Sequence, residues 1–214
     1  MEVRKFLIAG GNTTALVWGC DLGGEVTIAK DLLSTVEQVG FVSNKMGVDS
    51  LSMMGGELCV NATIALASLG GSEGSLAVEC IEDAPIRYEN AQGTTTVFLP
   101  LEYKLLENIV LFENIGYACT QIQEEVSKQT LSLLAERFNV PAFGSVFYKD
   151  SRIYPTVYVA ATNSLCKETA CGSGSVAVHI VTGAQKLMQP SGGVIEIEKL
   201  EGHTFVVRAH VSEI

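Results

Sequence analysis

Two short segments of this chain are built alike, and together they constrain the fold more than any other feature. In each, a loop leads to a cysteine, small or polar residues come after the cysteine, and a run of apolar residues comes next. The first unit is centred on Cys59 and the second on Cys171, 112 positions later. Both runs are apolar on nearly all sides, so each predicts a short buried helix beginning at its cysteine. We therefore expect two similar half-domains whose helix N-termini face one cleft.

The rest of the chain favours β-structure. Two further helices are predicted over 26–36 and 126–138 from their spacing of apolar residues. Residues 100–108 are the least patterned and predict the crossover, which divides the chain into an N-terminal half, 1–101, and a C-terminal half, 102–214. The fold class is therefore α+β. Strands are predicted at residues 2–9, 14–19, 41–42, 50–54, 75–80, 86–89, 94–99, 109–115, 118–122, 143–148, 153–160, 194–197 and 204–211.

Charge and hydropathy exclude several classes of partner. The formal net charge of −10 repels phosphate backbones and anionic lipids, so we expect neither a nucleic-acid nor a membrane partner. The apolar run near the N-terminus, residues 6–9, is too short for the core of a signal peptide. The longest uncharged stretch, 169–185, contains glycine, serine and threonine, which argues against a membrane span. We expect a soluble, cytoplasmic protein.

The cysteines and histidines give no metal-binding pattern. The six cysteines contain no C-x-x-C pair, and the three histidines are scattered. A disulfide scaffold is a poor interpretation of a chain this long without a secretory signal. We expect four of the cysteines to be buried hydrophobic residues, namely Cys20, Cys80, Cys119 and Cys166. The sequence predicts neither a metal nor any other cofactor.

Cys59 and Cys171 differ from the other four cysteines in their sequence context. A cysteine at a helix N-terminus lies at the positive end of the helix dipole, which is expected to lower the pKa of its thiol. Small residues after it leave the first-turn N–H groups accessible, and these can hold a carboxylate. The candidate carboxylate-binding residues are Val60, Asn61 and Ala62 in the first unit and Gly172, Ser173 and Gly174 in the second.

Two such units facing each other imply a specific reaction. Both helix ends would point at one amino-acid carboxylate and stabilise the enolate charge that develops on it. One thiolate would remove the α-proton, and the other cysteine, as a thiol, would protonate the opposite face. The pattern therefore predicts inversion at the α-carbon of an amino acid, with Cys59 and Cys171 as the two catalytic acid/base residues.

The motifs resemble the diaminopimelate-epimerase-like family of cofactor-independent racemases and epimerases. The second cysteine motif of that family is matched throughout by residues 170–174, and its first motif is similar to residues 59–63. Gly11-Asn12 stands where the family places a substrate-contacting asparagine. The resemblance implies a barrel-like, mostly antiparallel sheet around a central helix in each half, with the active site between the halves. It also implies catalysis without pyridoxal phosphate, and many relatives are homodimers.

Within this family, the chain most closely resembles the histidine racemases of staphylopine-type metallophore biosynthesis. The similar stretches are residues 11–17, 37–41, 54–59, 61–63 and 171–174. The resemblance implies that Asn12 and Glu37 contact the substrate and that histidine is the favoured amino acid.

The chain also departs from the family pattern. Val60 stands where a glycine is usual, and its side chain is expected to crowd the substrate carboxylate. Asn163 replaces an arginine that grips a second carboxylate in diaminopimelate epimerase, which favours a neutral or basic substrate. Thr162 replaces a glutamate of the site, and residues 116–118 lack the family's histidine.

Three functions stay open. The first is the racemase. The second is another enzyme of the same fold, although proline-racemase-like proteins place Gly-His after the first cysteine and phenazine-pathway isomerases lack the pair. The third is a non-catalytic binding protein, motivated by Val60 and the short chain. The sequence does not tell which amino acid is bound, which thiol is the base for the L isomer, or the oligomeric state. A Cys59–Cys171 disulfide is conceivable, so activity is expected to need reductant.

Overall fold

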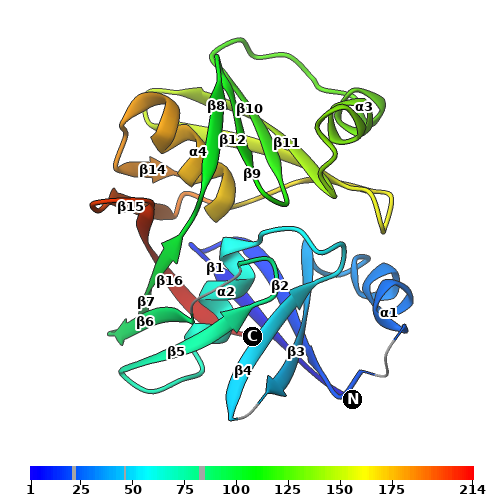
Figure 1. Ribbon diagram of the computed structural model, residues 1–214, viewed down its shortest axis with the longest axis vertical. Helices are drawn as coiled ribbons and strands as arrows, with labels where there is room; N and C mark the ends of the chain where they lie inside the picture. The colour runs from blue at the N-terminus through cyan, green and yellow to red at the C-terminus, as the bar shows by residue number, and fades with distance from the viewer. Residues whose placement is uncertain (21–22, 46, 82–84) are drawn as a thin grey trace.

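The computed structural model describes residues 1–20, 23–45, 47–81 and 85–214, and its fold is α+β (Figure 1). Hydrogen bonds connect the strands into one extended, strongly curved sheet. Among the described residues, no helix is both long and apolar enough to span a bilayer. The helices are α1 (Glu25–Leu32), α2 (Val60–Ala67), α3 (Lys128–Phe138) and α4 (Gly172–Thr182).

Eight strands close into a barrel around α2. In order of pairing, they are β1 (Glu2–Ile8), β2 (Asn12–Trp18), β3 (Gln38–Lys45), β4 (Val48–Met53), β5 (Glu73–Val78), β6 (Ile86–Ala91), β7 (Thr94–Pro100) and β16 (Thr204–Glu213). Strand β16 pairs back with β1 and so closes the barrel. Every residue of α2 is buried, and the helix contacts all eight strands. The prediction of a barrel-like sheet around a buried helix is confirmed here.

The remaining strands belong to the C-terminal part of the sheet. They are β8 (Tyr103–Leu106), β9 (Ile109–Phe112), β10 (Gly116–Thr120), β11 (Ala142–Lys149), β12 (Arg152–Val159), β13 (Ser164–Lys167), β14 (Lys186–Met188) and β15 (Val194–Lys199). Helix α4 packs against β9, β10, β11, β15 and β16, and α3 packs against β11 and β12 (Figure 1). Strand β16 pairs with β15 here and with β7 in the barrel, so the C-terminus of the chain returns to the N-terminal barrel. The division at residue 101 stays a prediction.

Three local expectations were wrong. The helix predicted to run to residue 36 ends at Leu32, because the hydroxyls of Ser34 and Thr35 donate to backbone carbonyls at its end and compete with helical hydrogen bonds. The crossover stretch contains a strand, β8, which forms a hairpin with β9. The single strand predicted over 109–115 stops at residue 112.

Candidate active site

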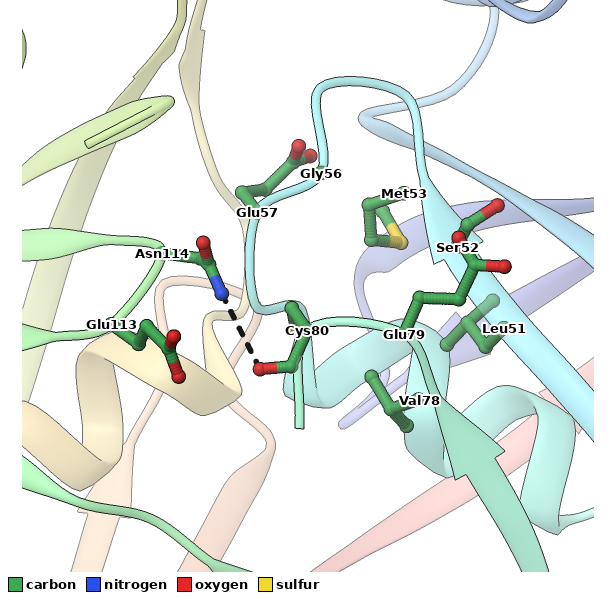
Figure 2. A pocket seen from close by; sticks show the side chains of 10 residues that line it. All are labelled: Leu51, Ser52, Met53, Gly56, Glu57, Val78, Glu79, Cys80, Glu113 and Asn114. Atoms are coloured by element: carbon green, nitrogen blue, oxygen red, sulfur yellow. Dashed lines mark hydrogen bonds between the residues drawn. The ribbon is translucent and has the colours of Figure 1, made fainter. Parts of the chain in front are cut away.

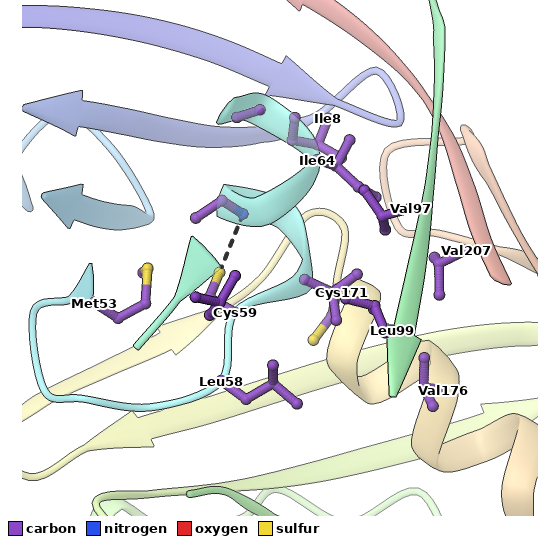
Figure 3. Close-up of a cluster of buried hydrophobic side chains, with 14 of the residues drawn as sticks. Ile8, Met53, Leu58, Cys59, Ile64, Val97, Leu99, Cys171, Val176 and Val207 are labelled. Carbon is purple, nitrogen blue, oxygen red and sulfur yellow. Dashed lines mark hydrogen bonds between the residues drawn. The ribbon is translucent and has the colours of Figure 1, made fainter. Parts of the chain in front are cut away.

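Each of the two cysteines is the N-cap of a buried helix, as the sequence predicts (Figure 3). Cys59 Sγ accepts the backbone N–H of Ala62 at 3.4 Å, and Cys171 Sγ accepts that of Gly174 at 3.2 Å. Both residues have extended backbone before the helix begins, which is the usual conformation of an N-cap. Both cysteines are free.

Hydrogen bonds join the first turns of α2 and α4, and they are made by the side chains that lie two residues after each cysteine. Asn61, in α2, donates from Nδ2 to the carbonyl of Ala170 at 2.9 Å. Its Oδ1 accepts the N–H of Gly172 at 3.0 Å. One buried amide therefore bonds to the residues on both sides of Cys171.

Ser173, in α4, makes the reciprocal pair of contacts. Its hydroxyl donates to the carbonyl of Leu58 at 3.2 Å and accepts the N–H of Val60 at 3.2 Å, so it bonds to the residues on both sides of Cys59. We call the four hydrogen bonds of Asn61 and Ser173 the helix clip. It places the two cysteine-bearing helix ends against each other in an approximately two-fold arrangement.

The helix clip changes the expected role of the first-turn N–H groups. Those of Val60 and Gly172 donate to the clip, and those of Ala62 and Gly174 donate to the thiols. Four of the six first-turn N–H groups expected to face a carboxylate therefore have a partner in this structure. The binding of a carboxylate at these helix ends stays a prediction.

The expected lowering of the thiol pKa values was also wrong. Burial raises the pKa of both Cys59 and Cys171 well above the ordinary value for a thiol, and the negative charge of Glu168 raises them further. The N–H groups of Ala62 and Gly174 lower the pKa of their thiols, but by less than burial raises them. Desolvation of a charged sulfur therefore outweighs the helix end in this closed form.

Two buried residues that the sequence pattern does not indicate extend a hydrogen-bonded path inward from Cys59. Cys59 Sγ donates to Oε1 of Gln38 at 3.1 Å, and Nε2 of Gln38 donates to Oε1 of Glu168 at 2.6 Å. Gln38 and Glu168 are both buried. Burial raises the pKa of Glu168 to about 7.

Tyr117 completes the surroundings of Cys171. Its hydroxyl lies 3.7 Å from Cys171 Sγ, within hydrogen-bonding distance for sulfur. Burial raises the pKa of Tyr117 well above its ordinary value, and negative charge at Cys171, Glu168 and Cys59 adds to this effect. Tyr117 stands in the stretch where the family's histidine is missing, so a neutral hydroxyl occupies that place.

Asn12 and Glu37 are hydrogen-bonded to each other, and Glu37 also accepts hydrogen bonds from Thr169, two residues before Cys171. Asn12 Nδ2 donates to Oε2 of Glu37 at 2.8 Å, and that oxygen also accepts the N–H of Thr169 at 3.0 Å. The Thr169 hydroxyl donates to the other oxygen of Glu37 at 2.5 Å. Burial raises the pKa of Glu37, although these hydrogen bonds oppose the shift. The contact of Asn12 and Glu37 with substrate stays a prediction.

A small enclosed pocket lies beside Cys59. It has a free volume of about 20 Å³, which holds about one water molecule. Residues from distant parts of the chain line it, among them Gln38, Tyr117 and the three acidic residues Glu37, Glu57 and Glu168. An amino acid does not fit in this volume, so we call this arrangement the closed form; the pocket would have to widen to admit one.

Val60 does not line this enclosed pocket. Its side chain is fully buried and packs against the α-carbon of Gly172, where a β-carbon would lie 2.8 Å away from it. In this structure the valine fills the space left by a glycine of the other helix end, and its effect on a substrate carboxylate stays a prediction.

Glu57 also lines a larger pocket of about 320 Å³ (Figure 2). The side chains of Glu79, Glu113 and Asn114 line this outer pocket, and Asn114 donates to the carbonyl of Cys80 at 3.3 Å. Among the residues that line it, Glu57 is shared with the enclosed pocket. Burial raises the pKa of Glu57 to about 7.

Several other residues lie outside the enclosed pocket. Thr162 bonds to Ser164, and the carbonyl of Asn163 accepts from Lys128. His179 is half-buried, and its Nδ1 contacts the carbonyl of Ala184 at 2.9 Å. Within the described ranges, His, Cys, Asp and Glu side chains form no group of three suited to a metal ion.

Comparisons with known proteins agree with this architecture at the level of the fold. No family model matches the chain. Two histidine racemases from strains of Fusobacterium nucleatum are 28% and 27% identical to it, over 85% of this chain and 84% and 83% of their own. A predicted epimerase from Pseudomonas aeruginosa superposes with a TM-score of 0.71 at 10% identity, covering 100% of this chain and 97% of its own. A PhzF-family phenazine biosynthesis protein from Enterococcus faecalis superposes with a TM-score of 0.60 at 12% identity, covering 100% and 97%. The chain therefore shares its fold with these two structures.

Proposed function

We propose that this protein is an isomerase that inverts the α-carbon of an amino acid, with Cys59 and Cys171 as acid and base. The observation that carries the proposal is that two buried helices, far apart in sequence, each begin at a cysteine and are clipped together at their first turns. A reaction that needs one proton acceptor and one proton donor on opposite faces of a carbon matches such a pair.

The relatives support this class of reaction. The two that match over most of the chain are histidine racemases, and a structure with the same fold carries the name of a predicted epimerase. Histidine is the substrate we favour. The acidic lining of the enclosed pocket, with Glu37, Glu57 and Glu168, suits a positively charged amino acid better than one with a second carboxylate.

In the proposed reaction, the two cysteines transfer the protons and the two helix N-termini stabilise the charge. A thiolate at one cysteine takes the α-proton, and the electron pair moves into the substrate carboxylate. The thiol of the other cysteine then donates its proton to the opposite face of the α-carbon. Each turnover exchanges the protonation states of the two sulfurs, so the reaction is reversible and uses only groups of this chain. The helix N-termini stabilise the charge that develops on the carboxylate.

The deciding experiment is proton NMR in deuterium oxide with reductant, on the L isomers of a panel that includes histidine. We expect loss of the α-proton signal for at least one basic or neutral amino acid, with inversion confirmed by chiral chromatography. Cys59→Ala and Cys171→Ala should each abolish inversion. Cys119→Ala is the matched control, because Cys119 is equally buried but lies within strand β10 and is the N-cap of neither helix.

A non-catalytic binding protein is the second candidate, and it is favoured by the burial of both thiols, which raises their pKa and so disfavours the thiolate that a base requires. It predicts that an amino acid binds by calorimetry while its α-proton does not exchange. It also predicts that alkylation of Cys59 leaves binding unchanged. Full inversion activity in Cys171→Ala would contradict the two-thiol mechanism directly.

A further inference from the structure

The carboxyl of Glu168 is buried, and the protein supplies a donor to one of its two oxygens. Its Oε1 accepts from Nε2 of Gln38 at 2.6 Å, whereas its Oε2 has no hydrogen-bond partner. Glu168 is 4% exposed, and within the described ranges this Oε2 is the one buried side-chain oxygen or nitrogen that lacks a partner. A buried acceptor without a donor is costly, so this oxygen indicates a donor that a bound molecule supplies.

The Gln38 amide fixes which oxygen of Glu168 is left. Oε1 of Gln38 accepts from the Cys59 thiol at 3.1 Å and from the Thr14 hydroxyl at 3.3 Å. Because these two donors hold the amide oxygen, the amide nitrogen faces Glu168 and occupies its Oε1. The carboxyl therefore has one oxygen bound to the protein and one oxygen for a ligand.

The two other carboxyls of the enclosed pocket have donors from the protein. Glu37 Oε2 accepts from Asn12 and from the N–H of Thr169, and its Oε1 accepts from the Thr169 hydroxyl. Glu57 accepts a backbone N–H at 2.9 Å. Among the carboxyls that line this pocket, Glu168 is therefore the one with a buried oxygen that lacks a donor.

Charge and size indicate an ammonium group as the missing donor. Glu37, Glu57 and Glu168 line the pocket, and within the described ranges no lysine, arginine or histidine lines it. The charges of Glu37 and Glu57 add to burial in raising the pKa of Glu168 to about 7, and a cation beside the carboxyl would offset this cost. The free volume of about 20 Å³ holds about one water molecule, which is the size of an ammonium group but not of an amino-acid side chain such as imidazole.

We propose that Oε2 of Glu168 accepts a hydrogen bond from the α-ammonium group of the substrate. This inference rests on the proposed function and adds to it the residue that distinguishes an amino acid from an acid without the amino group. The ammonium nitrogen is bonded to the reacting carbon, and one amide, that of Gln38, connects Glu168 to the Cys59 thiol. A carboxylate beside the group keeps it protonated, and the positive charge makes the α-proton easier to remove.

Paired ligands test this contact by calorimetry on reduced protein. The probes are L-histidine and imidazolepropionate, which differ in the amino group. We expect the native protein to bind L-histidine at least about tenfold more tightly than imidazolepropionate. In Glu168→Gln, the new amide would turn its oxygen to Gln38 and its NH₂ to the ligand, where it cannot accept, so the ratio should fall to about threefold or less. A ratio unchanged by the substitution would overturn the inference.

Glu57→Gln is the matched comparison for this ratio. It removes the other carboxyl of the enclosed pocket whose burial raises the pKa to about 7, so it measures the effect of losing one negative charge. We expect Glu57→Gln to lower the ratio by less than Glu168→Gln does. Equal reductions in the two variants would show that overall charge, and not a contact with Glu168, selects the amino group.

The native protein provides a test that stands if Glu168→Gln folds poorly, which circular dichroism would show. A cation beside Glu168 lowers its pKa, so binding at about pH 7 should release about half a proton for each L-histidine bound. Binding enthalpies in phosphate and in Tris buffer measure this release, because the two buffers take up a proton with different heats. Imidazolepropionate should release less. Equal release with both ligands, or none with either, would overturn the inference.

A measurement without any amino acid separates this inference from the proposed function. At about pH 8, where Glu168 is ionised, the thermal unfolding midpoint is compared in ammonium chloride and in the same concentration of tetramethylammonium chloride, whose cation has no N–H and exceeds the pocket. We expect ammonium to raise the midpoint by on the order of 2 °C in the native protein, with the difference lost in Glu168→Gln. The same difference in both proteins would contradict the site. Failure of the proposed function would instead appear as absence of α-proton exchange in native protein that ammonium stabilises.

Discussion

The side chain of Val60 fills the space left by the missing side chain of Gly172. A β-carbon built on Gly172 would lie 2.8 Å from both Cβ and Cγ1 of Val60 and 3.0 Å from Oδ1 of Asn61. Both neighbours belong to the buried start of α2, and Val60 is β-branched, so neither has room to move aside. A valine on one helix end is therefore tolerated because the other helix end carries a glycine.

This relationship predicts that Gly172→Ala destabilises the protein although alanine favours helices. Overpacking of a core costs about 1–3 kcal/mol, against about 1 kcal/mol gained from helix propensity. The difference leaves a fall of up to about 2 kcal/mol in the free energy of unfolding in urea. Adding Val60→Ala should recover part of this loss in the double variant. Additive effects of the two substitutions would show that the two side-chain positions do not compete for space.

The helix clip predicts a second, larger effect. Ser173→Ala leaves the Val60 N–H and the Leu58 carbonyl buried without their partner, which costs about 1–3 kcal/mol for each group. Ser68→Ala is the control, since the Ser68 hydroxyl is half-buried and donates only within its own helix, to the carbonyl of Ala65. Urea unfolding of both variants measures the difference, and faster hydrogen exchange at the Val60 N–H in Ser173→Ala would locate it. Equal stability of the two variants would contradict the clip.

The sequence pattern predicted the two helix starts, and the family resemblance implied the barrel-like sheet, but neither indicated the polar network around the helix starts. Cysteine followed by small residues and an apolar run is a local signal, and it identified Cys59 and Cys171 correctly as helix N-caps. Gln38 and Glu168 come from strand β3 and from the loop before α4, so only the tertiary fold brings them together. The sequence does offer one indication that Glu168 belongs to the site, because it stands three residues before Cys171.

The direction of the thiol pKa shift could not be predicted from sequence for a physical reason. A helix N-terminus lowers the pKa of a cysteine that stays in contact with water, whereas desolvation raises it. Which effect is larger depends on how tightly the site closes, and the closure is set by contacts such as Asn61 with Ala170 and Ser173 with Leu58. Hydropathy patterns do not report such contacts.

Oxidation gives a third prediction. Cys59 and Cys171 are free in this structure, and we expect activity to depend on keeping them reduced. The rate of α-proton exchange should fall after aerobic oxidation and return with dithiothreitol, while mass spectrometry reports whether the two cysteines have become linked. Equal rates with and without reductant, in protein shown to be oxidised at these cysteines, would contradict the prediction.

A fourth prediction concerns the pH dependence of stability. Burial raises the pKa of Glu57 from 4.5 to about 7 in the folded protein. The folded state then binds this proton more tightly than the unfolded chain does, so the stabilisation it gives is complete below about pH 4.5 and is lost as the pH rises to about 7. The shift corresponds to about 3 kcal/mol.

Glu57→Gln tests this prediction, because glutamine keeps an oxygen that can accept the Gly55 N–H but does not ionise. Its free energy of unfolding should be close to that of the native protein at about pH 5 and exceed it by up to about 3 kcal/mol at about pH 8. The control is Glu79→Gln, an exposed residue paired with Lys45, which should change stability by less than about 0.5 kcal/mol at either pH. If Glu57→Gln shifts stability equally at both pH values, the Glu57 carboxyl does not titrate in this range, and the closed pocket is better solvated than its geometry indicates.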